Sequence, residues 1–565
     1  MHVPYEEVSG ANVSPRDAAQ HGIVGQKIAL DENASKNEQP DSEIPAQSDA
    51  GEDPSWITGS PLLIMMSALS IVMFLVLLDS SIIGAATPKI TTEFHSLNDV
   101  GWYGSAFQLA SATCQPLAGK LYSTLNQKWV YLTFFTVFEI GSLLCGVAPS
   151  SVILIVGRAV AGIGAAGLQS GSLTIVATSA PLHRRAALNG ILMALSQSGI
   201  VLGPLIGGAF TTYSTWRWCF YINLPLGAVV AALLLFVRIP QPKAMIPSEE
   251  PTVKALIEGF DSLGFVLLTG FAIELLIALE WGGSTYAWNS SVIIGLLVGS
   301  AATLVVFLFW QRHKGDEAMI QFSMVGKLVV WCSCLNYAFL SSALRLVSYY
   351  VPIYFQSVLN ATAILSGVYT LPSIIAQVIT SIISGILVGR LGYYLPWSIV
   401  SGILMTIGTG LMSTFDVATS VGQWIGYQIL FGAGCGLGIP MPILAVQNSL
   451  ASSDIPIAIS ILIFFQNIVS AVWLAVASTI LTSSLQSYFP HFAPSVDPAT
   501  IIQAGATGIR DVVPQGPVLA QVLSAYSKAI DNTFYIATAS LGAGIFFIWG
   551  MGWKDIRQTK KITPV

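Results

Sequence analysis

Apolar stretches long enough to cross a bilayer follow one another along the chain from residue 61 to residue 553, separated by short polar breaks. A helical span needs about 20 apolar residues. Backbone groups in lipid must be bonded within their own segment, and the alternating pattern of a membrane barrel is absent, so each stretch predicts a helix. About fourteen spans are expected, near residues 61–87, 100–118, 129–148, 151–178, 188–210, 218–237, 260–280, 291–311, 328–355, 364–389, 394–414, 420–448, 456–483 and 531–553.

The composition agrees with a polytopic membrane protein. Of 565 residues, 53% are hydrophobic and 9% are charged, against about 25% charged in an ordinary soluble domain. So few charges cannot coat a folded particle of this size, which excludes a soluble globule. The charge balance also excludes a nucleic-acid-binding surface. The six cysteines lie in or beside apolar runs without a C-x-x-C pair, so neither a metal site nor a disulfide is expected.

The basic residues between the spans indicate the orientation. Fifteen Lys and Arg residues fall on one side of the predicted topology and four on the other, and the positive-inside rule places the richer side, with both termini, in the cytosol. The first 60 residues are polar and acidic, which predicts a disordered cytosolic tail. Two N-glycosylation sequons, at Asn289 and Asn360, fall on the outer side in short loops.

Six ionisable residues lie inside apolar spans: Asp79, Glu139, Arg158, Glu274, Glu280 and Arg345. Each is costly there, so a pathway, a proton relay or a buried pair is the default explanation. Asp79 lies too deep for its short side chain to reach the interface, and Arg158 is the cation expected to control it, because arginine does not itself titrate. Glu139 is a second proton carrier or makes a structural hydrogen bond. Arg345 contacts an anion or substrate, or pairs with an acid such as Glu274.

Glycines recur at helix-packing spacing in the fifth span. Gly199, Gly203 and Gly207 fall on one helical face, and Pro204 removes a backbone donor and bends the helix. Closely packed, interrupted helices suit a protein whose halves rock about a central cavity.

These motifs resemble the major facilitator superfamily, and specifically its fourteen-span drug:proton antiporters, which are common in fungi. The resemblance covers residues 61–553. Its sharpest part is the antiporter motif Gly199-x-x-x-Gly203-Pro204-x-x-Gly207-Gly208, together with the run from Trp216 to Gly227. The segments 79–88 and 158–167 are similar to the family's first-span and fourth-span motifs. One departure is Ser123, which stands where many members have an aspartate, so a gating role for that acid is not carried over.

The resemblance implies an all-α fold of two six-helix bundles with two extra central helices. The expected organisation is a tail over 1–60, a bundle over 61–238, a linker over 239–259, extra helices over 260–311, a second bundle over 312–553 with an external loop over 484–530, and a tail over 554–565. It also implies proton-coupled efflux of a hydrophobic or amphipathic compound. Protons would bind at Asp79 or Glu139, and no cofactor is expected because the proton gradient supplies the energy. The expected cavity residues are Gln108, Gln197, Arg345, Tyr350, Gln356, Gln447 and Gln466.

The leading hypothesis is export of a fungal secondary metabolite, toxin or drug by a monomer in the plasma membrane, with lipid as its other partner. A second is a vacuolar or plasma-membrane transporter of basic amino acids or siderophores, and the number of acids in the cavity would discriminate the two. A membrane enzyme lacks support because the sequence shows no paired His and Asp, nucleophile elbow or metal-ligand spacing. A non-transporting nutrient receptor stays open.

Overall fold

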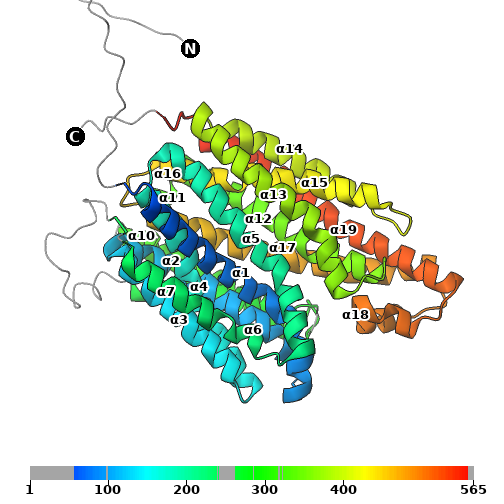
Figure 1. The fold of residues 1–565 in the computed structure, drawn as a ribbon. Helices are drawn as coiled ribbons and strands as arrows, with labels where there is room; N and C mark the ends of the chain where they lie inside the picture. Colours follow the sequence, from blue (N-terminus) through cyan, green and yellow to red (C-terminus); the bar gives the residue numbers. More distant parts are fainter. Residues whose placement is uncertain are drawn as a thin grey trace, which may run out of the picture. The chain divides into compact units, whose positions relative to one another are not determined.

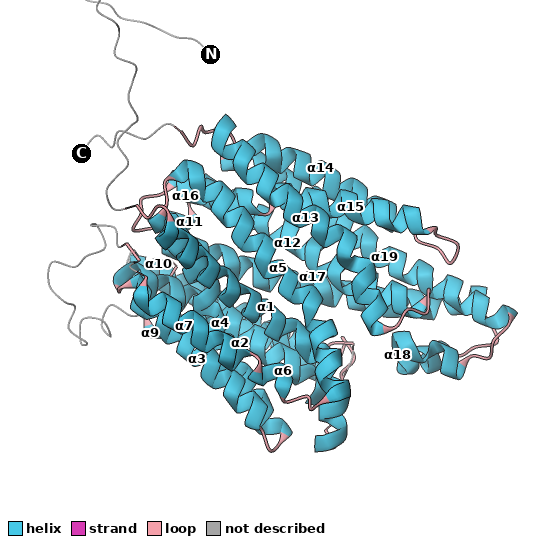
Figure 2. Ribbon diagram, viewed as in Figure 1, coloured by secondary structure: helices cyan, strands magenta, loops and turns pink. Residues whose placement is uncertain are grey.

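The computed structural model describes residues 56–96, 99–237, 239–240, 261–283, 285–315, 318–320 and 322–557. Most of the three segments predicted as tails and linker, 1–60, 239–259 and 554–565, lies outside these residues. The described part is helical, with two isolated β-bridges and no longer strand (Figure 2). This confirms the all-α membrane fold.

The first group of helices forms one bundle (Figure 1). α1 packs along α5, while α4 packs against both α2 and α3. α6 and α7 follow each other closely and together form the sixth span. The bounds are α1 Ser60–Phe94, α2 Val100–Thr124, α3 Gln127–Val147, α4 Ser151–Ser179, α5 Leu182–Tyr213, α6 Trp218–Tyr221 and α7 Asn223–Phe236.

The two extra helices, α9 Ser262–Trp281 and α10 Ser291–Lys314, pair with each other, and α9 also packs against α2 and α17. The buried carboxylate of Asp261 joins the start of α9 to the end of α10. It caps the start of α9 through the N–H of Gly264 at 2.9 Å, and it accepts hydrogen bonds from Trp310 Nε1 at 2.7 Å and Gln311 Nε2 at 2.8 Å. A short helix, α11 Phe322–Val325, leads into the second bundle.

The second bundle repeats the plan of the first. α12 packs against α17 and α19, α13 against α15, and α14 against α15 and α19. The bounds are α12 Leu328–Ser357, α13 Ala363–Leu391, α14 Leu395–Met412, α15 Val421–Gly438, α16 Pro440–Ser449, α17 Ile455–Phe492, α18 Pro498–Val512 and α19 Pro517–Ile548, followed by the 3₁₀ turn η4 Trp549–Met551.

Thirteen helical segments of the described residues are long and apolar enough to cross a membrane. The remaining predicted span, 100–118, is the 25-residue helix α2, which packs between α4 and α17. Its polar positions include Ser105, Gln108, Ser111 and Gln115, and they make it the least apolar of the bundle helices. A helix enclosed by other helices needs less apolar surface than one that faces lipid, so α2 fits the bundle despite its composition.

The segment predicted as an external loop, 484–530, is largely helical. α17 continues to Phe492 and α19 begins at Pro517, with α18 between them (Figure 1). Arg510 of α18 donates hydrogen bonds to the carbonyl oxygens of Ser357 at 2.6 Å and Val358 at 3.0 Å, at the C-terminal end of α12. A cation at a helix C-terminus satisfies the last carbonyl groups, so α18 is anchored to the bundle.

Candidate functional site

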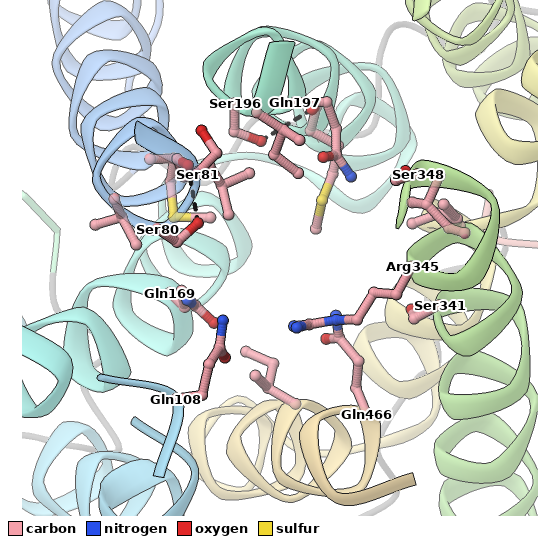
Figure 3. Close-up of a pocket in the computed structure, with 18 of the residues that line it drawn as sticks. Ser80, Ser81, Gln108, Gln169, Ser196, Gln197, Ser341, Arg345, Ser348 and Gln466 are labelled. Carbon is pink, nitrogen blue, oxygen red and sulfur yellow. Dashed lines mark hydrogen bonds between the residues drawn. The ribbon is translucent and has the colours of Figure 1, made fainter. Parts of the chain in front are cut away.

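A cavity of about 330 Å³ lies between the two bundles (Figure 3). Helices α1, α2, α4 and α5 line it from the first bundle, and α12 and α17 line it from the second. Its wall is mixed, with aliphatic and aromatic groups such as Met73, Phe107 and Tyr337 between polar ones. The polar groups labelled in Figure 3 are Ser80, Ser81, Gln108, Gln169, Ser196, Gln197, Ser341, Arg345, Ser348 and Gln466.

Helical periodicity explains which side chains line the wall. From α12 they are Tyr337, Ser341, Leu344, Arg345, Ser348 and Tyr349, which recur every three or four positions and so lie on one helical face. α1 contributes Leu77, Ser80 and Ser81 by the same rule. Asp79 is about 100° from Ser80 and about 160° from Ser81 around the helix, and it faces α4 instead of the cavity.

Arg345 reaches from α12 into the cavity, with Gln466 beside it and Gln108 and Gln169 on the facing wall (Figure 3). Its Nη2 donates a hydrogen bond to Asn467 Oδ1 at 3.1 Å. The acid considered as its partner, Glu274, lies between α9 and α10, where it accepts a hydrogen bond from Thr303 at 3.2 Å. The structure therefore does not bring Arg345 and Glu274 together.

Asp79 and Arg158 form an ion pair that is closed to solvent: their exposed fractions are 1% and 0%. Arg158 Nη1 donates to Asp79 Oδ2, and Arg158 Nε donates to the carbonyl oxygen of Tyr103 at 2.9 Å. Asn223 Nδ2 donates to Asp79 Oδ1 at 3.3 Å and to Ser142 Oγ at 3.0 Å. Residues of α1, α2, α3, α4 and α7 thus form one hydrogen-bonded network around the Asp79 carboxylate.

Phe107 links the ion pair to the cavity. The Arg158 guanidinium lies over its ring, 4.6 Å from the centroid, and the same residue forms part of the cavity wall. A cation over an aromatic face is stabilised by the ring quadrupole. Phe107 is therefore in contact with the Arg158 guanidinium and also part of the cavity wall.

Glu139 makes no hydrogen bond or ion pair with Asp79 or Arg158 among the described residues, and it does not line the cavity. Its carboxylate is packed against Gly227 of α7, where a Cβ atom would collide with it. Both carboxylate oxygens are buried without a hydrogen-bond partner among the described residues. A structural hydrogen bond from a described residue, one of the two explanations open for Glu139, is therefore not observed.

Of the residues expected in the cavity, Gln108, Gln197, Arg345 and Gln466 line it, and the other three lie elsewhere. Tyr350 is buried in the core of the second bundle beside Tyr349, one helical step from the lining face. Gln356 lies farther along α12 and donates to Ser366 Oγ at 3.4 Å.

Gln447 is the third of these residues, and it joins the two bundles. It accepts a hydrogen bond from Asn189 of α5 at 3.2 Å and donates to the carbonyl oxygen of Leu173 of α4 at 3.4 Å. Nearby, α5 and α13 are so close that a Cβ on Gly190 would lie 2.6 Å from the carbonyl oxygen of Ser381. The bundles are therefore in tight contact on the side that the basic residues place in the cytosol.

The antiporter-motif glycines set the distance between α5 and α1. A Cβ on Gly199 would lie 2.5 Å from the carbonyl oxygen of Phe74, and one on Gly203 would collide with the hydroxyl of Ser81. Gly207 faces Ile82 in the same row, whereas Gly208 faces open space. Pro204 lies inside α5 between these contacts.

The two sequons lie in exposed segments between helices. Asn289 and Asn360 are both exposed, and Asn360 has a left-handed backbone with φ of 55°. The third sequon residue of Asn360, Thr362, caps α13 through Leu365 N–H at 3.2 Å. Among the described residues, no group of three or more His, Cys, Asp or Glu side chains could hold a metal ion.

Three amides at the site were not among the expected residues. Asn223 lies inside the run from Trp216 to Gly227, Asn467 directly follows Gln466, and Gln169 lies in α4. The available signal was a lone amide in an apolar span, which marks an interhelical hydrogen bond. Ser341 and Ser348 gave no comparable signal, because a serine in a helix identifies a cavity only once the lining face is known.

Comparison with known proteins identifies the family. Residues 69–474 match the family model of the Major Facilitator Superfamily. The MFS-type transporter pigP of Monascus ruber is 54% identical over 511 residues, which cover 90% of this chain and 89% of that protein. Efflux pump mlcE of Penicillium citrinum is 49% identical over 507 residues, covering 88% and 92% of the two chains.

Solved structures support the same fold. The proton:xylose symporter XylE, an MFS protein, superposes with a TM-score of 0.56 and covers 88% of this chain and 98% of its own, at 14% sequence identity. The chain therefore belongs to the major facilitator superfamily, among fungal relatives named as MFS-type transporters and efflux pumps.

Proposed function

We propose that this protein exports a hydrophobic or amphipathic small molecule, such as a fungal secondary metabolite, toxin or drug, across the plasma membrane in exchange for protons. The observation that carries the proposal is the cavity between the bundles, with a mixed apolar and amide wall, next to a buried carboxylate–arginine pair. The efflux-pump names of the fungal relatives favour export as the direction of transport.

The ion pair supplies a route for proton coupling. With Asp79 ionised, the pair and its bond from Asn223 hold α1, α4 and α7 together. A proton arriving from outside would neutralise Asp79 and leave the buried charge of Arg158 without its counter-ion, which is strongly unfavourable. Arg158 would then shift against Phe107 and alter the cavity wall, so that proton uptake favours release of the substrate.

Alternating access follows from the same geometry. The bundles are in contact at their cytosolic ends through Asn189 and Gln447, so reloading from the cytosol requires these contacts to part while α5 and α13 rock against each other. The close-packed glycine face of α5 keeps α1 and α5 moving as one body.

The cavity does not favour the alternative of basic amino acids as substrates. A cationic substrate is stabilised by carboxylates that lack another partner. Within the described residues the cavity wall contains no Asp or Glu, and it contains a cation, Arg345.

The test is uptake into inside-out membrane vesicles from cells that express the protein, with a panel of labelled amphipathic metabolites. Acidifying the vesicle lumen should drive accumulation of at least one compound, and a protonophore should abolish it. Vesicles without the protein provide the background. Accumulation that is independent of the pH gradient, or absent for every compound, would contradict proton-coupled export. Fractionation of plasma and vacuolar membranes tests the location.

A further inference from the structure

One cation in the cavity wall has no acidic partner. The described lining residues include Arg345 and no Asp or Glu. The other buried arginine of the region, Arg158, is neutralised by Asp79 and lies behind Phe107. The central cavity therefore carries a formal positive charge from its own wall.

The arginine is under-satisfied as well as unpaired. A guanidinium has five N–H donors in a planar fork, and the bond found among the described residues is the one from Nη2 to Asn467 Oδ1. The rest of the fork opens into the cavity, toward Gln466 and the facing amides of Gln108 and Gln169 (Figure 3).

A charge in this position is costly without a partner. An ionisable group inside the membrane opposes folding unless an opposite charge or a set of hydrogen bonds stabilises it, and a neutral amide such as Asn467 compensates little of a full charge. A bound carboxylate would supply both the counter-charge and the paired acceptors that the guanidinium fork matches.

The geometry points to an anionic substrate: we propose that the exported molecules are amphipathic acids, whose carboxylate is bound by Arg345 while their apolar part lies against Met73, Phe107 and Tyr337. The amides of Gln108, Gln169 and Gln466 would donate further hydrogen bonds but do not select charge, because an amide serves equally as donor and acceptor. The inference rests on the proposed function in one respect, since it takes this cavity as the substrate site.

The test is equilibrium binding to the purified full chain in detergent, with no pH gradient. The probes are 1-naphthaleneacetic acid and its uncharged carboxamide, which differ only at the group that Arg345 would contact. At neutral pH the acid is ionised. Wild type should bind the acid more tightly than the amide. Arg345→Gln should weaken binding of the acid by about 10- to 100-fold and leave binding of the amide nearly unchanged.

Two further variants complete the design. Arg345→Lys keeps the charge but loses the planar fork, so it should still prefer the acid, with affinity between those of wild type and Arg345→Gln. Arg312→Gln removes a positive charge from the exposed cytosolic end of α10 and should bind both probes like wild type. If Arg345→Gln does not yield folded protein, the affinities of wild type and Arg345→Lys for the acid and the amide test whether residue 345 selects the charged probe.

Equal affinity of wild type for acid and amide, no binding of the acid, or an unchanged ratio in Arg345→Gln would each overturn the inference. So would loss of the acid preference in Arg345→Lys. The outcomes are separable from those of the transport test. Charge-selective binding without gradient-driven transport would contradict only the proposed function. Gradient-driven transport without charge selectivity would contradict only the anionic substrate.

Discussion

Replacing Asp79 by asparagine is expected to destabilise the protein because it isolates a buried cation. Arg158 would keep its bond to the carbonyl oxygen of Tyr103 and its contact with Phe107, but it would lose its counter-ion at a site with no exposure. Removing one partner of a buried pair costs about 3 to 5 kcal/mol, and Arg158→Gln should cost a similar amount by leaving the carboxylate unpaired.

The double variant distinguishes a coupled pair from two separate residues. With both charges gone, Asp79→Asn/Arg158→Gln buries neutral groups. Its loss of unfolding free energy should be close to that of one single variant, about 4 kcal/mol, and well below the sum of the two single losses, about 8 kcal/mol. The assay is unfolding of the purified protein in mixed micelles of increasing denaturing detergent, followed by tryptophan fluorescence.

A matched control cycle uses Lys327 and Asp454, a surface pair 3.8 Å apart whose side chains are 51% and 35% exposed. This pair should show a coupling of less than about 1 kcal/mol. Strictly additive losses in the Asp79 and Arg158 cycle would refute the view that the pair acts as a unit, and with it the proposed consequence of protonating Asp79.

Three further results are expected. Gly203→Ala should lower thermal stability and transport because the added methyl group collides with α1. Gly208 faces open space, so Gly208→Ala should leave both quantities near wild type. Equal losses of stability in the two variants would contradict the packing role of the glycine face. Glu93 lies beyond the membrane-spanning part of α1, and hydrogen bonds from Trp216 and Arg217 lower its pKa. Ionised Glu93 therefore contributes fully to the free energy of unfolding above its unfolded pKa of about 4.3. That contribution is lost as pH falls through the lowered folded pKa. Glu93→Gln should reduce the loss of unfolding free energy at acidic pH by less than about 1 kcal/mol, because the Glu93–Arg217 pair is partly exposed. A loss at acidic pH equal to that of wild type would contradict this role of Glu93. Finally, if one proton enters as a monovalent anion leaves, two charges cross the membrane in each cycle. An inside-negative potential of about 100 mV should then favour export by about 4.6 kcal/mol. A transport rate that does not change with potentials imposed by valinomycin would contradict an exchange of that charge.

The sequence predicted the membrane fold well because each span must satisfy its own backbone and therefore leaves an apolar stretch about 20 residues long. α2 shows the limit of this signal, since a helix enclosed by protein can carry a polar wall. The helical character of 484–530 was underestimated for a related reason: α18 lies outside the apolar spans, and its anchoring by Arg510 to the end of α12 depends on a tertiary contact.

The candidate site was partly predictable. Asp79 and Arg158 were expected together because neither is tolerated alone in lipid, and the structure places them in contact. Tyr350 and Gln356 were expected in the cavity and lie outside it because the sequence shows which residues are polar but not which face of α12 is turned inward. Arg345 and Tyr350 differ by five positions, and so by about 140° around the helix.

Proton-coupled export by this protein requires that Asp79 carry the proton that drives transport. The most direct measurement is proton flux in proteoliposomes with an acidic lumen and a pH-sensitive dye inside, recorded when a substrate of the protein is added outside. With the cytosolic face outward, wild type should alkalinise the lumen as substrate accumulates. Asp79→Asn, folded and inserted to the same extent, should neither alkalinise the lumen nor accumulate substrate. Asp454→Asn should do both, as wild type does. Substrate-induced proton flux of wild-type size in Asp79→Asn would contradict the account.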